Sequence, residues 1–98
     1  MKDKINIINL YDCYSNLFTD KQIMYFEDYY FEDLSLSEIA ENYNISRAAA
    51  HKQIKDVVSK LNDYESKLKI LEKKEKIIKL LKEKDIKIKE EIEEILKW

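Results

Sequence analysis

The chain has 98 residues, and 18 basic side chains nearly balance 20 acidic ones, which leaves a formal net charge of −2. It contains no glycine, so it cannot carry the glycine-rich loops with which nucleotide-binding enzymes bring backbone close to phosphate. One cysteine, Cys13, and one histidine, His51, supply neither an internal disulfide nor the ligands of a structural zinc site. We therefore expect one small protein without a cofactor, in a reducing compartment.

The sequence shows no pattern of a membrane span or of an export signal. A span needs roughly 18 or more consecutive apolar residues, and no stretch of this chain approaches that length. Charged side chains interrupt the first twelve residues, which is unlike a secretory signal. We expect a cytoplasmic protein.

The charges are divided unevenly along the chain. Residues 1–45 hold 3 basic and 9 acidic side chains, a net of −6, whereas residues 46–98 hold 15 basic and 11 acidic ones, a net of +4. Charged residues make up 39% and hydrophobic residues 45% of the sequence, a mixture typical of amphipathic helices. The two halves are expected to face different partners.

Apolar spacing predicts a first helix over residues 4–16 and a second over residues 20–31. Thr19 and Gln22 have the spacing of a capping box, in which each side chain bonds the backbone N–H of the other residue. The first helix carries two rows of apolar side chains at three- and four-residue steps. One row is Ile5, Ile8 and Tyr11 (or Asp12), and the other is Ile7, Leu10, Tyr14 and Leu17. On the second, we expect Ile23, Phe26 and Tyr30 to face inward, with Met24 and Phe31 beside them. This spacing favours a role in the core over base stacking for the aromatic cluster Tyr25, Phe26, Tyr29, Tyr30 and Phe31.

Residues 36–55 satisfy the steric requirements of a helix-turn-helix. A second capping box at Ser35 and Glu38 begins a short helix through about Asn42, and Ser46 begins the next helix. Between them Asn44 takes the position where a left-handed backbone is needed, which asparagine tolerates. Ala40 is small enough for two helices to cross closely. The expected shared core of the motif is Ile39, Ala40, Tyr43, Ile45, Ala50 and Ile54.

The second helix of this motif is expected to present Arg47, Ala48, His51, Lys52 and Lys55 to a nucleic acid. Arg47, Lys52 and Lys55 suit phosphate contacts, and His51 suits a base edge, with Gln53 at the margin of the face. The alanines at 48–50 lack hydrogen-bonding groups, so direct base readout is expected to be thin and binding weak.

No constellation of catalytic residues surrounds the single histidine. His51 lies on the predicted recognition face, and no carboxylate or nucleophile is spaced to work with it in acid–base chemistry. Cys13 has no basic sequence neighbour that would lower its pKa, so we interpret it as a small core or boundary residue. We predict that the protein is not an enzyme.

The C-terminal part carries a heptad-like seam and a final helical stripe. We divide the chain into a helical domain over residues 1–60 and a helical extension over residues 61–98. Asn62 and Asp63 are either a new helix cap or polar surface residues within a longer helix. Lys82 to Lys84 suggest a solvated corner. Asp85 suggests a cap before a last helix that finishes at Trp98. The seam packs against the first helices or against a second copy, and we favour a homodimer. Its predicted interface consists of Leu61, Tyr64, Leu68, Leu71, Ile78, Ile92 and Ile95.

The run from Leu17 to about Leu61 resembles the YlxM family of small bacterial helix-turn-helix proteins, itself similar to region 4 of sigma factors. The family pattern is matched by Leu17-Phe18-Thr19-Asp20-Lys21-Gln22, by Glu27 to Tyr30, by Ser35 to Ala40, and by Ile45-Ser46-Arg47 followed by Ala49. The resemblance implies an all-α fold: a sigma-region-4-like helix-turn-helix, then a long amphipathic helix and a short C-terminal one.

The same resemblance implies a nucleic-acid-binding regulatory role. It also implies a link to the signal recognition particle pathway, which rests on gene neighbourhood. The alternative is an adaptor that binds RNA or protein components of that particle and has little affinity for DNA.

Overall fold

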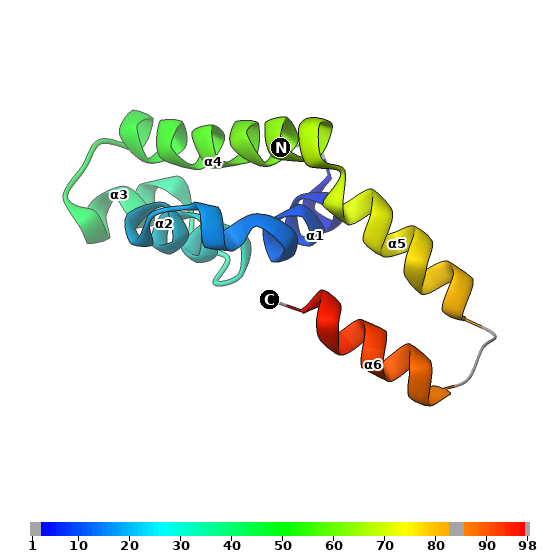
Figure 1. The fold of residues 1–98 in the computed structure, drawn as a ribbon. Coiled ribbons are helices and arrows are strands. Elements are labelled where there is room, and N and C mark those ends of the chain that lie inside the picture. Colours follow the sequence, from blue (N-terminus) through cyan, green and yellow to red (C-terminus); the bar gives the residue numbers. More distant parts are fainter. Residues whose placement is uncertain (1–2, 83–85, 98) are drawn as a thin grey trace.

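The computed structural model describes residues 3–82 and 86–97, and all regular secondary structure within these ranges is helical, without a strand (Figure 1). The all-α prediction is confirmed. Its elements, in chain order, are α1 (Lys4–Tyr14), a 3-10 turn η1 (Ser15–Leu17), α2 (Asp20–Tyr30), α3 (Leu36–Tyr43), α4 (Arg47–Leu68), α5 (Ile70–Leu81) and α6 (Ile86–Leu96). The predicted corner at Glu83 and Lys84, the cap at Asp85 and the terminal Trp98 lie outside the described residues.

Helix α1 buries three residues of one predicted apolar row and Tyr11 of the other. Ile7, Leu10 and Tyr14 lie in the core, whereas Ile5 is 75% exposed. The helix ends at Tyr14, two residues earlier than predicted, and the 3-10 turn that follows advances the chain by a larger angle per residue. Leu17 is therefore exposed, and Phe18 takes the buried position that we expected for Leu17.

Helix α2 begins at the predicted capping box and buries much of its aromatic cluster. The Thr19 side chain accepts from the Gln22 backbone N–H, and the Gln22 side chain accepts from that of Thr19. Phe26 and Tyr30 are buried as predicted. Tyr25 was not among the residues predicted to face inward, but it is buried as well. Its ring packs edge-on against that of Tyr43, with 4.9 Å between the ring centroids.

Helices α3 and α4 form the predicted helix-turn-helix. Ser35 and Glu38 make the second capping box, and the Ser46 hydroxyl accepts from the backbone N–H of Ala49 at 3.0 Å. Asn44 ends α3 with a φ of 55°, the left-handed conformation that the motif requires. Four members of the expected shared core are buried: Ile39, Ala40, Ala50 and Ile54.

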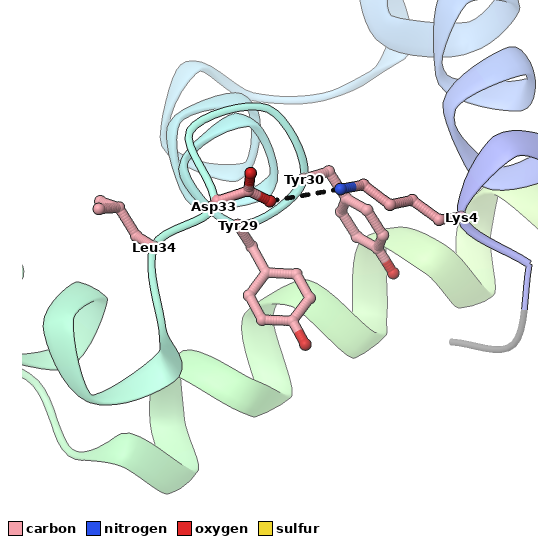
Figure 2. Close-up of a pocket in the computed structure, with 5 residues that line it drawn as sticks. All are labelled: Lys4, Tyr29, Tyr30, Asp33 and Leu34. Atoms are coloured by element: carbon pink, nitrogen blue, oxygen red, sulfur yellow. Dashed lines mark hydrogen bonds and ion pairs between the residues drawn. The ribbon is translucent and has the colours of Figure 1, made fainter.

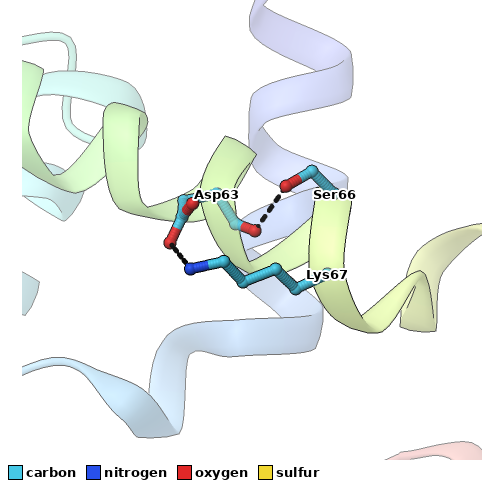
Figure 3. A network of polar contacts seen from close by, with 3 residues as sticks. All are labelled: Asp63, Ser66 and Lys67. Carbon is cyan, nitrogen blue, oxygen red and sulfur yellow. Dashed lines mark hydrogen bonds and ion pairs between the residues drawn. The ribbon is translucent and has the colours of Figure 1, made fainter.

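Helix α4 continues without a break through Asn62 and Asp63, which answers the question that the sequence left open. Both side chains bond within the helix: Asn62 Nδ2 donates to the Val58 carbonyl at 3.1 Å, and the Asp63 carboxylate pairs with Lys67 Nζ at 3.1 Å (Figure 3). The Ser66 hydroxyl donates to the Asp63 carbonyl at 2.8 Å. The domain boundary predicted between residues 60 and 61 therefore falls inside a helix.

The chain bends instead at Lys69, which has a φ of 55° between α4 and α5. Two side chains accept hydrogen bonds from backbone N–H groups in the first turn of α5 at this bend. The Glu65 carboxylate accepts from the backbone N–H groups of Leu71 and Glu72, each at 3.1 Å, and the Tyr14 hydroxyl accepts from that of Ile70 at 3.1 Å. Tyr14 in turn donates to Glu65 at 2.6 Å. The start of α5 is thereby attached to both α1 and α4.

Part of the predicted dimer seam is covered within the chain, which corrects that prediction. Leu61 is completely buried and Leu71 is 8% exposed, both in the single hydrophobic core. Tyr64 packs against Tyr14 and Phe18, with ring centroids 5.8 and 5.9 Å apart. Tyr14 belongs to α1, which packs against both α4 and α5. The other predicted interface residues are less buried: Ile78 and Ile92 are half-buried, and Leu68 and Ile95 are exposed.

Candidate nucleic-acid interface

The inner face of α4 determines which of its side chains point outward. Ala50, Ile54, Val57 and Leu61 follow one another at three- and four-residue steps, and all four are completely buried. Because α4 packs against α1, α2 and α3 along this row, the helix has little freedom to rotate. The opposite stripe is therefore held in a defined orientation.

That outer stripe contains the five residues that the sequence predicts as the nucleic-acid face. Each of them is exposed, and their spacing of one, four, five and eight residues from Arg47 places them on one side of the first turns of α4. They are Arg47, Ala48, His51, Lys52 and Lys55. We call this surface the α4 stripe.

One cation of the α4 stripe has a neighbour that the sequence reasoning missed. Lys52 Nζ lies 2.9 Å from Asp56 Oδ2, an ion pair one helical turn long. The four-residue spacing of a lysine and an aspartate could have predicted this pair. Exposed pairs of this kind contribute about 0–1 kcal/mol, so the Lys52 ammonium can exchange Asp56 for a phosphate.

The alanine triplet reduces base readout less than its sequence suggests. Ala50 is buried in the core, and Ala49 is half-buried at the edge of the α4 stripe. Of the three alanines, Ala48 alone is exposed, so the triplet costs the surface a single position for a hydrogen-bonding side chain. A methyl group there suits apolar contact with a thymine methyl.

The described part of the chain shows no group of three or more histidine, cysteine or acidic side chains arranged to hold a metal ion. Among its helices, none combines the length and the apolar character that crossing a membrane requires. Cys13 is buried in the core, as the sequence predicts, and burial raises the pKa of its thiol.

The fold and the α4 stripe define a helix-turn-helix protein. The family described as "Putative helix-turn-helix protein, YlxM / p13 like", the UPF0122 family, matches residues 1–97. The chain belongs to this family, and the resemblance drawn from its motifs is confirmed.

Relatives from several bacteria support this assignment. UPF0122 protein FN1394 of Fusobacterium nucleatum is 46% identical over 93 residues, which cover 94% of this chain and 90% of the relative. UPF0122 protein BH2485 of Halalkalibacterium halodurans is 44% identical over 87 residues, 85% of this chain and 80% of the relative. UPF0122 protein MYPE4850 of Malacoplasma penetrans is 52% identical over 69 residues, 70% of this chain and 64% of the relative. No solved structure matches the chain.

Proposed function

We propose that the protein is a non-enzymatic regulator that binds nucleic acid through the α4 stripe. The observation that carries this proposal is the stripe itself: three cations and a histidine on the exposed side of a helix whose other side is buried in the core. Arg47, Lys52 and Lys55 bind phosphates, and His51 contacts a base edge. The helix-turn-helix family of the chain supports this assignment.

The stripe favours affinity over sequence discrimination. Most of its hydrogen-bonding groups are suited to phosphate, which positions a protein on a duplex without reading sequence. His51 and the Ala48 methyl are the parts that face base edges, so few base pairs are distinguished directly. Binding is therefore dominated by counterion release and is strongly salt-dependent.

A salt titration of duplex DNA binding tests the proposal. We expect the triple variant Arg47→Ala, Lys52→Ala, Lys55→Ala to weaken binding similarly on unrelated sequences. The slope of log affinity against log salt should fall by up to about 0.9 for each phosphate that the variant no longer neutralises. Lys60→Ala is the matched control, because Lys60 is an exposed lysine of the same helix that lies off the stripe. Unchanged affinity and slope in the triple variant would refute the assignment.

The second candidate function is an adaptor that binds RNA or protein components of the signal recognition particle. The observation that favours an RNA contact is a cavity of about 470 Å³ between α5 and α6, which three lysines line together with Glu75 and Ile78. The lysines are Lys79, Lys82 and Lys89. Recognition by charge and shape suits a folded RNA. A competition titration between duplex DNA and a base-paired RNA of equal length distinguishes the two candidates.

We also propose that the protein is a homodimer joined through the α5–α6 hairpin. Because Leu61, Tyr64 and Leu71 are covered within the chain, the proposal depends on apolar side chains that stay exposed at the end of α4 and on the hairpin. They are Leu68, Ile77, Leu80, Ile88 and Ile95. A two-fold partner would cover this surface by an isologous contact. It would also set two α4 stripes at a fixed separation, as helix-turn-helix dimers require.

A further inference from the structure

His51 is the residue of the α4 stripe whose charge can change near neutral pH. It is the only histidine in the sequence, and histidine is the side chain that ordinarily gains or loses its charge between about pH 5 and pH 8. His51 is exposed on α4, so a nucleic acid bound at the stripe can reach it. The charge that it carries there affects how the stripe binds.

The side chains beside His51 on α4 are mostly cations. Arg47 and Lys55 lie one helical turn before and after it, at the four-residue spacing that makes side chains neighbours, and Lys52 follows it directly. The one acid in the first three turns of α4 is Asp56, and its carboxylate pairs with Lys52 Nζ at 2.9 Å. A proton on His51 therefore adds a fourth positive charge to a surface that already carries three.

The acids of the other helices lie on elements that pack against the opposite side of α4. Helices α1, α2 and α3 contact α4 along its buried row. Their carboxylates are Asp12 on α1, Asp20, Glu27 and Asp28 on α2, and Glu38 and Glu41 on α3. In the loop after α2, Asp33 Oδ1 lies 3.3 Å from Lys4 Nζ at the start of α1 (Figure 2). The exposed side of α4 around His51 is thus governed by the cations of the stripe.

A proton changes which atoms the imidazole ring can bind. A neutral ring donates from one nitrogen and accepts at the other, whereas a protonated ring donates from both. Phosphate oxygens accept hydrogen bonds, and so do N7 and O6 of guanine in the major groove. The protonated ring therefore suits these acceptors better, and its hydrogen bonds to a phosphate are strengthened by charge.

We propose that the α4 stripe takes up a proton at His51 when it binds nucleic acid, so that its affinity rises as the pH falls from about 7.5 to about 5.5. This inference rests on the proposed function, because the nucleic acid supplies the acceptors. The negative phosphates favour the protonated ring in the complex, whereas in the free protein that charge stands beside three cations. The coupling is reciprocal: a complex that holds the proton more tightly binds more tightly at lower pH.

Titrations of a fluorescent DNA duplex with the full chain at pH 5.5, 6.5 and 7.5, at constant salt, test the proposal. We expect the affinity to rise at least about five-fold from the highest to the lowest pH. The slope of log affinity against log salt should steepen by up to about 0.9. Equal affinity at the three pH values would overturn the proposal. Absence of binding at every pH would refute the nucleic-acid-binding function, and this inference with it.

Variants separate His51 from the general effect of pH on the charges of the protein. His51→Gln keeps a hydrogen-bonding side chain without a charge, so it should bind with similar affinity at all three pH values. The double variant His51→Gln, Lys60→His is the matched control, because it returns one histidine to an exposed position of the same helix that lies off the stripe. A full pH effect in His51→Gln, or its return in the double variant, would overturn the proposal.

Calorimetry counts the proton. Binding enthalpies at pH 6.5 in two buffers with different enthalpies of ionisation should differ by an amount that corresponds to the uptake of up to about one proton. They should agree for His51→Gln. Equal enthalpies for the unmodified protein would contradict proton uptake.

The composition of the duplex locates the acceptor that the protonated ring contacts. An equal pH effect on duplexes of A·T pairs and of G·C pairs supports a contact with phosphate, and a larger effect on G·C pairs supports a contact with the guanine edge. A larger effect on A·T pairs would contradict the proposal, because the adenine edge replaces one of the two guanine acceptors with a donor.

Discussion

Tyrosine hydroxyls join the helices of this protein through carboxylates on other helices. Each of three bonds links a different helix pair: Tyr11 to Glu27 at 2.7 Å, Tyr14 to Glu65 at 2.6 Å, and Tyr43 to Asp28 at 2.6 Å. Hydrogen bonds from a hydroxyl to an ionised carboxylate are short and stronger than neutral ones. These three pairs therefore position α1, α3 and α4 relative to their neighbours in a chain that has no disulfide.

The tyrosine bonds predict a loss of stability at alkaline pH. The hydrogen bond to Asp28 raises the pKa of Tyr43 to about 12, and burial, with the bond to Glu65, raises the pKa of Tyr14 to about 12. An unfolded tyrosine has a pKa of about 10. Because the native state holds these protons more tightly, their stabilisation is complete below pH of about 10 and is lost as the pH rises from there toward 12.

Urea denaturation at several pH values between 8 and 11.5 measures this effect, and the unfolding free energy should fall across the upper part of that range. Tyr43→Phe is the matched variant: it should be less stable at pH 8 and should lose less stability on going to pH 11.5. A free energy that stays constant over this range in the unmodified protein would contradict the interpretation.

A second prediction at this scale concerns Ala40, at the crossing of α3 and α4. Ala40 is buried, so a larger side chain there must displace packed neighbours. We expect Ala40→Leu to lower the free energy of unfolding by about 1–3 kcal/mol. Ala48→Leu adds the same side chain at an exposed position of α4 and should change stability by less than about 0.5 kcal/mol. Equal thermal unfolding curves for Ala40→Leu and the unmodified protein would place the helix crossing elsewhere.

At the scale of elements, helix starts were predictable and one helix break was not. The caps at Thr19, Ser35 and Ser46 each act over three residues, so the local sequence contains the whole interaction. The break at Lys69 depends on Tyr14, whose hydroxyl meets the backbone of Ile70 across 56 positions of sequence. No local pattern contains that interaction, and lysine is not a residue that typically takes a left-handed conformation.

The spacing of side chains predicted which of them share a helix face but not what covers that face. The α4 stripe could be located because the residues opposite it have the size and spacing of a core row. The same reasoning placed Leu61 and Leu71 on one apolar face and assigned that face to a second copy. In the structure both side chains lie in the core, Leu61 on α4 and Leu71 on α5, and α1 packs against both of these helices. Periodicity alone does not specify which helices pack together.

The bend at Lys69 leads to a prediction about Glu65. Glu65→Ala removes the acceptor of the Tyr14 hydroxyl and of two backbone N–H groups in the first turn of α5. We expect it to lower the free energy of unfolding by about 1–3 kcal/mol. Hydrogen exchange should speed up at the amides of Leu71 and Glu72. Glu75→Ala, at an exposed acid of α5, should leave exchange at these amides unchanged, and unchanged exchange in Glu65→Ala itself would contradict the capping role.

At the scale of the whole molecule, the fold separates two kinds of surface. The acidic half of the sequence forms α1, α2 and α3, and the basic half begins with the α4 stripe. The molecule measures 51 × 25 × 23 Å because the α5–α6 hairpin extends from the body that α1 to α4 form (Figure 1). Exposed carboxylates more than about 8 Å from a bound phosphate are largely screened at physiological salt. We therefore expect the acidic surface to weaken the proposed nucleic-acid binding without preventing it.

The hairpin also has the charge pattern of a self-complementary surface. Helix α5 has four lysines and two glutamates, a net of +2, whereas α6 has two lysines and four glutamates, a net of −2. In a two-fold pairing, α5 of one copy can lie against α6 of the other, with opposite charges beside the exposed apolar side chains. Complementary charges of this kind favour a specific pairing over a non-specific apolar association.

Sedimentation of the full chain tests this dimer. We expect a dimer at micromolar concentration, and we expect the double variant Leu80→Glu, Ile95→Glu to be monomeric with an unchanged melting temperature. Both side chains are more than 70% exposed in the single chain, so the charges enter no packed core. Ile5→Glu is the matched control, because Ile5 is 75% exposed on α1, outside the hairpin, and it should leave the dimer intact. A truncation at Lys60 is a poorer test, since it cuts α4 and removes the buried Leu61. A monomeric unmodified protein would refute the dimer, and a double variant that stays dimeric would place the interface on another surface.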